Sequence, residues 1–206
     1  MSLRDRIWYP ILYMSAITLI SSAVILLFGS LTRQRVQDNQ LIAFERAVLG
    51  ALGAGEQELS TPSAIHTAYS TLIREPDESS AGAFRFIKDD SLIAYALPLE
   101  GPGFWAPIKG VIGILADRRT VTGIAFYEQN ETPGLGGEIV KGAFTKQFEG
   151  KTLSDGDPAL SIAPVSVVLD EHTVHAVTGA TQTSTRLAKF MNETIADWRT
   201  RMERKE

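Results

Sequence analysis

A hydroxyl-rich loop is the part of this sequence whose residue types best fit a chemical role. Thr178-Gly179-Ala180-Thr181-Gln182-Thr183-Ser184 leads directly into a stretch with helical periodicity. Backbone N–H groups and the positive end of a helix dipole favour a phosphate group at such a position. An ordinary polar turn with Ser184 as the N-cap explains the same residues. The loop alone leaves both interpretations open.

Other short patterns fail the tests of the chemistry they suggest. Glu149–Thr152 is similar to the end of a P-loop, but Thr145 stands where the earlier glycine is required. Gly101–Ala106 fits G-x-G-x-x-A, yet Pro107 and a predicted strand follow it instead of a helix. The sequence contains no G-x-S-x-G nucleophile elbow, and its three histidines lack a metal-ligand spacing. We therefore expect no metal site and no catalytic residues.

Composition narrows the classes of function further. The chain has 206 residues, 44% of them hydrophobic and 21% charged, which is typical of a globular protein. Its net charge is −4 and no Lys/Arg run occurs, so we expect no nucleic-acid partner. The absence of cysteine excludes disulfides, thiolate zinc sites and cysteine-ligated iron–sulfur clusters.

The N-terminal segment predicts a membrane anchor. No charged residue lies between Arg6 and Arg33, and Ile11–Phe28 is apolar apart from Ser and Thr. About 20 such residues in a helix cross a 30 Å hydrocarbon core. The run exceeds the usual apolar region of about 7–15 residues in a signal peptide, and no A-x-A site follows. The pattern favours an uncleaved anchor over residues 1–32, with a cleaved signal peptide or a buried core helix as the alternatives.

The remaining chain predicts an α+β fold with a mostly antiparallel sheet. We expect a helical stalk or connecting region over 33–78, in which Gly53 and Gly55 end the helix that continues the anchor to Ala51, and one domain over 79–206. Turn residues separate the expected strands, and Glu131–Ile139 is predicted to be a loop. The expected strands are Phe84–Phe86, Leu92–Leu97, Ile108–Ala116, Val121–Tyr127, Val165–Leu169 and Thr173–Val177; the expected helices are Lys141–Phe148 and Thr185–Arg201.

Three segments together resemble a known family. Thr178–Ser184 resembles the S/T-G-A-T-x-T-S flavinylation motif of the FMN-binding domain family. Glu131–Ile139, with the sequence ETPGLGGEI, is similar to the second signature of that family, and Gly103-Phe104-Trp105 is similar to a third. Their order and the anchor resemble the C subunits of sodium-translocating NADH:quinone oxidoreductases and the G subunits of Rnf complexes. The resemblance extends over about Leu97–Trp198 and the anchor, and it leaves the choice between the two complexes open.

The resemblance implies a covalently bound FMN. In this family a flavin transferase moves FMN from FAD onto a threonine hydroxyl, and the motif places the acceptor at Thr181, with Thr183 as the second choice. Glu131 has either a functional role or a role in its own loop, and Trp105 and Phe104 are either packing partners of the flavin ring or plain core residues. The implied cofactor-binding residues are Trp105, Glu131, Thr132, Pro133, Gly134, Leu135, Gly136, Thr178, Gly179, Ala180, Thr181, Thr183 and Ser184.

The implied function is electron transfer by a membrane-anchored flavoprotein subunit without substrate chemistry of its own. Its expected partners are other membrane subunits, lipid and the flavin transferase. The resemblance places the chain in the bacterial cytoplasmic membrane, with the soluble domain on the extracytoplasmic side. His175 stands where the family motif usually has aspartate, which favours the alternative of an anchored sensor or binding domain without flavin. A standalone FMN domain serving an extracytoplasmic reductase is a third interpretation.

Overall fold

The computed structural model describes residues 8–54 and 60–204. Contacts divide the chain into two compact units, Met1–Leu41 and Ile42–Glu206. Arg6 and Gly55, which entered the sequence analysis, lie outside the described residues. The two units are described separately below.

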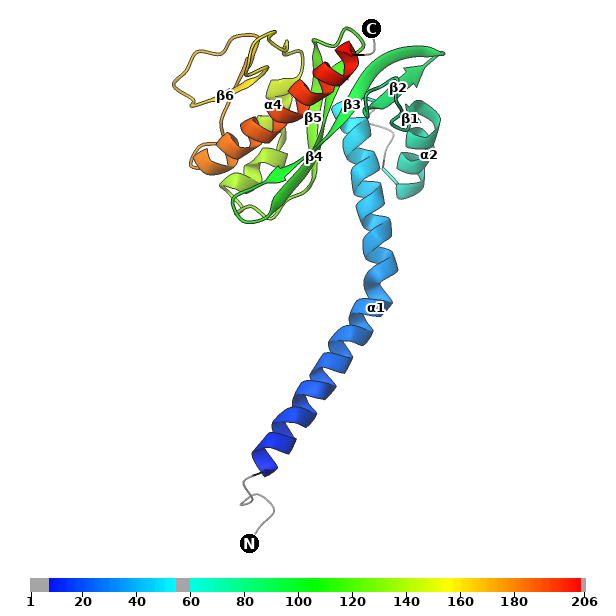
Figure 1. The fold of residues 1–206 in the computed structure, drawn as a ribbon, viewed down its shortest axis with the longest axis vertical. Helices are drawn as coiled ribbons and strands as arrows, with labels where there is room; N and C mark the ends of the chain where they lie inside the picture. Colours follow the sequence, from blue (N-terminus) through cyan, green and yellow to red (C-terminus); the bar gives the residue numbers. More distant parts are fainter. Residues whose placement is uncertain (1–7, 55–59, 205–206) are drawn as a thin grey trace. The chain divides into compact units, whose positions relative to one another are not determined.

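Most of the described part of the first unit belongs to helix α1, which runs from Tyr9 to Ala51 (Figure 1). Its most apolar 18-residue window has a mean hydropathy of 2.3, and none of that window is buried. Large apolar side chains such as Leu19 and Phe28 are about 70% exposed. A core helix would bury these side chains, so that interpretation is wrong within the described chain. By length and composition α1 can cross a membrane, a test that a signal sequence also passes.

The second unit is built on a five-stranded antiparallel sheet (Figure 1). Antiparallel neighbours follow one another along the chain, and short turns connect all of them except the first two strands, which residues 75–83 join. Asp89 and Asp90 both have positive φ, as a two-residue hairpin turn requires. In the turn between the last two strands, Asp117 Oδ1 accepts the N–H groups of Arg119 and Thr120. The strand order is β1 (Ile73–Arg74), β2 (Phe84–Lys88), β3 (Ser91–Pro102), β4 (Pro107–Leu115) and β5 (Val121–Glu128).

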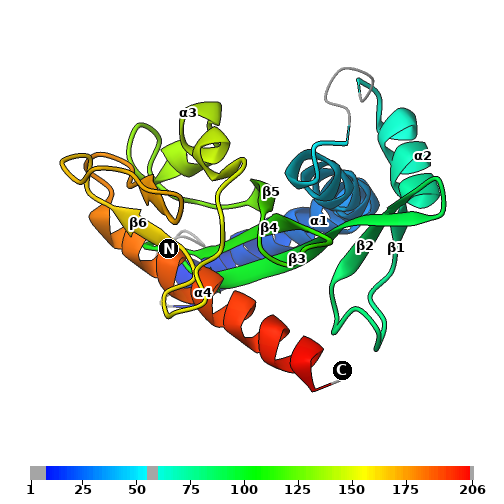
Figure 2. The same cartoon turned by 90° about the horizontal axis from the view of Figure 1, so that it is seen from above.

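Both faces of the sheet are covered, which explains why its strands carry apolar residues at consecutive positions. Helix α4 (Thr181–Glu203) covers one face, and the last turns of α1 with α2 (Pro62–Leu72) cover the other (Figure 2). Alternating residues of β3 point to opposite sides, as the pleat requires. The α4 side holds Tyr95, Leu97, Leu99, Ile112, Leu187, Phe190, Met191, Ile195 and Trp198; the other side holds Val48, Leu49, Ile65, Tyr69, Ala94, Ala96 and Val111.

The end of α1 approaches the sheet backbone closely. The Thr122 hydroxyl donates to the Ala51 carbonyl at 2.6 Å. A Cβ at Gly113 would lie 2.4 Å from that same carbonyl oxygen, so a larger residue there would displace the helix end. These contacts lie within the second compact unit, which begins at Ile42, inside the 33–78 segment that the sequence analysis treated as a stalk or connecting region.

The second half of the unit is less regular, and three sequence predictions fail here. The chain forms η2 (Gly136–Val140), α3 (Gly142–Thr145), η3 (Lys146–Phe148) and a parallel pair of β6 (Ser161–Ala163) with β7 (Thr173–His175). The first failure is the loop expected over Glu131–Ile139, whose last four residues belong to the 3-10 helix η2. Val165–Leu169 is not a strand, since Pro164 cannot donate to a ladder and the N–H of Val167 donates back to its carbonyl. β7 ends at His175, two residues earlier than expected.

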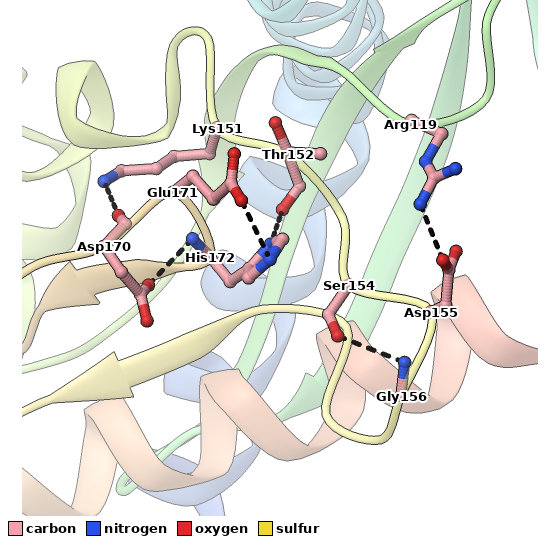
Figure 3. A network of polar contacts seen from close by, with 9 residues as sticks. All are labelled: Arg119, Lys151, Thr152, Ser154, Asp155, Gly156, Asp170, Glu171 and His172. Carbon is pink, nitrogen blue, oxygen red and sulfur yellow. Dashed lines mark hydrogen bonds and ion pairs between the residues drawn. The ribbon is translucent and has the colours of Figure 1, made fainter.

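A polar network joins the segment after η3 to the segment before β7 (Figure 3). The Lys151 ammonium donates to the Asp170 carbonyl at 2.6 Å, and His172 Nδ1 donates to the Thr152 carbonyl at 2.5 Å. The Asp170 carboxylate accepts the N–H of His172 at 2.8 Å. These bonds give His172 a structural role and fix the entry into β7, which leads toward the hydroxyl-rich loop.

Candidate functional site

A cleft of about 370 Å³ lies where three segments of the second unit meet. The segments are the tip of the β3–β4 hairpin, the loop before η2 and the start of α4. They are the same three segments that carry the family resemblance, although up to about 80 residues separate them in the chain. The cleft is lined by Phe104, Trp105, Glu131, Thr132, Leu135, Gly136, Gly179, Ala180, Thr181, Gln182 and Thr183.

Glu131 connects the three segments through one buried carboxylate, which is 6% exposed. Its Oε1 accepts the N–H groups of Phe104 and Trp105 at 2.8 and 3.1 Å. Its Oε2 accepts the Thr183 hydroxyl at 2.5 Å. The sequence left open whether Glu131 serves the site or its own loop; its partners lie 26–52 residues away, so it organises the whole cleft.

Aromatic side chains form one wall of the cleft. Trp105 is 68% exposed, and its indole N–H donates to the Thr132 hydroxyl at 3.0 Å. Phe104 meets Trp105 edge to face with 4.9 Å between ring centroids. The guanidinium of Arg186 lies over the Phe104 ring and also donates to the Gly103 carbonyl. The two rings are therefore held in place at the surface and are not core residues.

Helix α4 begins at Thr181, four residues earlier than expected from the sequence. The N-cap is Ala180 and it supplies no side-chain hydrogen bond, so the prediction of Ser184 as N-cap is wrong. Gly179, with a φ of +76°, turns the chain directly into the helix. The first residues of α4, Thr181–Thr183, line the cleft, and no side chain caps the helix there. A helix start without a capping side chain can bind an anion through its N–H groups.

The hydroxyls of the loop differ sharply in accessibility. Thr181 is exposed and lines the cleft. Thr183 and Ser184 are each 3% exposed, and both hydroxyls have partners. The Thr183 hydroxyl donates to Glu131, and the Ser184 oxygen accepts the N–H of Val177 at 3.2 Å. Only Thr181 among these three offers an accessible hydroxyl in the cleft.

Four of the expected cofactor residues do not line the cleft: Pro133, Gly134, Thr178 and Ser184. The N–H of Gly134 donates to Glu138 Oε1 at 3.1 Å and does not face the cleft. The hydrogen bond from Lys141, together with that N–H, lowers the pKa of the Glu138 carboxyl.

Gln182 lines the cleft and was missed as a site residue because its side chain has no distinctive chemistry. Arg186 was missed because its partners lie in the distant hairpin.

His175, the residue that departs from the family motif, lies at the end of β7 and outside the cleft lining. Its N–H donates to Gln147 Oε1 at 2.8 Å, and its ring Nε2 donates to the Val167 carbonyl at 3.1 Å. These contacts are structural. They hold β7 and the exposed 165–169 segment together on the approach to Gly179.

Comparisons with known proteins agree with the resemblance stated from the motifs. Residues 103–196 match the family model described as FMN-binding domain, which confirms the resemblance over this part of the chain. The C subunit of the Na(+)-translocating NADH-quinone reductase of Vibrio vulnificus is 39% identical over 113 residues, which cover 52% of this chain and 43% of the relative. Its counterpart from Neisseria meningitidis is 40% identical over 99 residues, covering 47% and 38%. The matched part of the chain thus spans less than half the length of these relatives.

Solved structures confirm the fold. The C subunit of the Na(+)-translocating NADH-quinone reductase of Parabacteroides distasonis superposes with a TM-score of 0.70 at 22% identity, covering 82% of this chain and 96% of that one. NqrC of Shewanella oneidensis gives a TM-score of 0.65 at 20% identity, covering 78% and 96%. The expected architecture, an apolar N-terminal helix followed by an α+β domain with an antiparallel sheet, is therefore correct.

Proposed function

We propose that this chain is a membrane-anchored electron-transfer subunit that carries FMN covalently on Thr181. The observation that carries the proposal is the cleft itself, in which all three family signatures meet beside the exposed Thr181 of the flavinylation motif. The relatives are C subunits of Na(+)-translocating NADH-quinone reductases, which favours a complex of that type over an Rnf complex.

The residues of the cleft fit a flavin phosphate. The cleft has a volume of about 370 Å³, which falls in the range of about 300–1,000 Å³ that is usual for cofactor and ligand sites. Phe104, Trp105 and Leu135 supply apolar surface, and all three are 44–68% exposed. The uncapped start of α4 supplies N–H groups and a positive dipole end for the phosphate. Bound flavin would supply the electron-transfer chemistry.

Attachment needs only the Thr181 oxygen from this chain. That oxygen forms a P–O bond to the FMN phosphate of FAD, and the P–O bond of the pyrophosphate breaks to release AMP. The hydroxyl proton leaves to solvent. A flavin transferase supplies the catalysis, and the tight Gly179 turn lets it reach the hydroxyl. Thr183 is a poor acceptor because its hydroxyl is buried and already donates to Glu131.

The N-terminal helix would hold the carrier beside its electron donors and acceptors. The apolar window of α1 serves as an uncleaved anchor in the lipid of the cytoplasmic membrane, next to other membrane subunits. The proposal places the FMN-binding domain on the extracytoplasmic side, where covalent attachment prevents loss of the flavin.

Flavin fluorescence in a denaturing gel tests the proposal. The full chain is expressed with a bacterial flavin transferase, beside Thr181→Ala, Thr183→Ala and Thr178→Ala. We expect a fluorescent band for the parent, Thr183→Ala and Thr178→Ala, and a complete loss for Thr181→Ala. Fluorescence retained in Thr181→Ala would reject the acceptor. No band in the parent, with the transferase active on another substrate, would favour the anchored domain without flavin.

A further inference from the structure

The carboxylate of Glu131 occupies a space that two glycines keep open. A Cβ at Gly103 would lie 2.6 Å from Glu131 Oε1, and a Cβ at Gly136 would lie 2.5 Å from Oε2. Both distances are far shorter than a van der Waals contact. Gly103 and Gly136 belong to two different signature segments, so both segments have the glycine that this buried carboxylate requires.

The hydrogen bonds of Glu131 keep a negative charge at the cleft wall. All three are accepted by the carboxylate, from two N–H groups and one hydroxyl, which is the bonding pattern of its ionised form. Among the ion pairs of the described residues, none includes Glu131. The nearby guanidinium of Arg186 donates to the Gly103 carbonyl and does not pair with this carboxylate. A buried charge without a cation at ion-pair distance is weakly screened, so it acts strongly on its neighbours.

Glu138, seven residues along the same segment, has the opposite surroundings. Its carboxylate lies 3.0 Å from the Lys141 ammonium and its side chain is 30% exposed. It does not line the cleft. The two carboxylates form a matched pair, one buried and unpaired at the cleft, the other paired with a cation and in contact with solvent.

We propose that Glu131 tunes the flavin site electrostatically, by keeping a negative charge without an ion-pair partner against the cleft and so lowering the reduction potential of the bound flavin. This inference rests on the proposed function. Adding electrons to a flavin brings negative charge into the cleft, and a fixed negative charge nearby opposes it. The hydrogen bonds from Phe104, Trp105 and Thr183 hold the carboxylate in place, so the distance between its charge and the bound flavin would be fixed.

The test compares reduction potentials of flavin-loaded full chains. Glu131→Gln removes the charge and keeps the shape: the amide oxygen can accept both N–H groups while the amide nitrogen donates to Thr183. We expect Glu131→Gln to shift the oxidised-to-reduced ratio at fixed potential at least tenfold toward reduced flavin, which is about 30 mV for a two-electron couple. Glu138→Gln makes the same change of net charge outside the cleft, and we expect it to stay within threefold of the parent.

Glu131→Asp separates charge from packing, because it keeps the charge on a shorter stem. We expect its potential to stay near that of the parent, although the hairpin bonds are weakened. Thermal unfolding of each flavin-free chain checks that the variants fold. The proposal would be overturned by an unchanged or lower reduction potential in Glu131→Gln. It would also be overturned if Glu138→Gln or Glu131→Asp shifted the potential as much as Glu131→Gln does. A parent without covalent flavin would instead reject the proposed function.

Discussion

Burial distinguishes hydroxyls that look equivalent in the sequence. Thr181 and Thr183 are two residues apart on the first turn of α4, so their side chains point about 200° apart around the helix. Thr183 is directed into the protein and is bonded to Glu131, whereas Thr181 remains exposed. Under the proposed attachment, the choice of Thr181 over Thr183 would follow from where the helix starts, since the two side chains have the same chemistry.

Gly136→Ala tests the packing around the buried carboxylate. The added methyl group would lie 2.5 Å from Glu131 Oε2 and 2.6 Å from the Thr183 hydroxyl, and both side chains are buried. Overpacking of this kind costs about 1–3 kcal/mol. We expect the free energy of unfolding in denaturant to fall by that amount. Gly142→Ala is the matched control, since its nearest neighbour would be 3.6 Å away, and an equal loss there would contradict the account.

The sequence predicted the residues of the cleft better than their roles. The motif residues Thr181, Glu131 and Leu135 all line it. The role of Glu131 could not be predicted because its hydrogen-bond partners lie 26, 27 and 52 residues away in the chain. No local pattern contains such contacts. The same holds for Arg186, whose guanidinium contacts the hairpin 83 residues earlier.

At the scale of elements, the packing of the C-terminal end of α1 against the sheet depends on Gly113. An alanine there would place its methyl group 2.4 Å from the Ala51 carbonyl oxygen and 2.1 Å from the Thr122 hydroxyl. We expect Gly113→Ala to lower the unfolding free energy by about 1–3 kcal/mol, because the helix end must shift. Chemical denaturation of the detergent-solubilised chain measures this. Gly156→Ala is the control: its methyl group would have its nearest neighbour at 3.5 Å, so the unfolding free energy should change little. An unfolding free energy of Gly113→Ala equal to that of the parent would contradict the close approach.

The connection into β7 predicts an acid-dependent loss of stability. Hydrogen bonds from the Thr173 hydroxyl and the His172 N–H lower the pKa of Asp170 below its ordinary value of 3.8. A lowered folded-state pKa stabilises the fold above the unfolded-state value, and this contribution is lost as the pH falls through the folded-state value. We expect Asp170→Asn to lower the melting temperature at pH 6, with the difference from the parent shrinking below pH 4. A difference that is constant with pH would contradict this, and Glu149→Gln serves as an exposed control.

Turn chemistry made the sheet predictable, while apolar composition alone misled. The Asp89-Asp90 and Asp117–Arg119 turns separate strands that the structure contains. Val165–Leu169 has an equally strand-like composition but lies exposed, with Val168 89% accessible. Strand formation depends on a neighbouring partner, and a single sequence does not record which segments find one.

At the scale of the whole molecule, the proposed membrane anchor in α1 would decide where the domain works. We expect Leu19→Arg to impair membrane insertion, since an arginine at the centre of a span costs about 2.5–3.5 kcal/mol. Leu19 lies in the apolar stretch of α1 with its side chain 71% exposed. Alkaline carbonate extraction of membranes measures the effect: the parent stays in the pellet and the variant is partly released. Gln34→Arg, beyond the apolar run, is the control.

Release of the parent by carbonate, or equal retention of Leu19→Arg, would contradict the anchor. A shortened mature chain would instead support the signal-peptide alternative.

Periodicity and length predicted the apolar helix and the α+β class, but they did not predict that the compact unit starts at Ile42. Its start depends on contacts of the last turns of α1 with the sheet, which only the folded structure contains.

Mass spectrometry of the parent chain is the most direct test of the central claim. Trypsin should release the peptide from Thr152 to Arg186, which contains every hydroxyl of the 178–184 loop and excludes Thr132, the other threonine of the cleft. We predict that this peptide carries the mass of one FMN phosphoester, and that fragment ions place it between Ala180 and Gln182. An unmodified peptide from a chain matured with active transferase, or FMN on another residue, would contradict covalent attachment at Thr181.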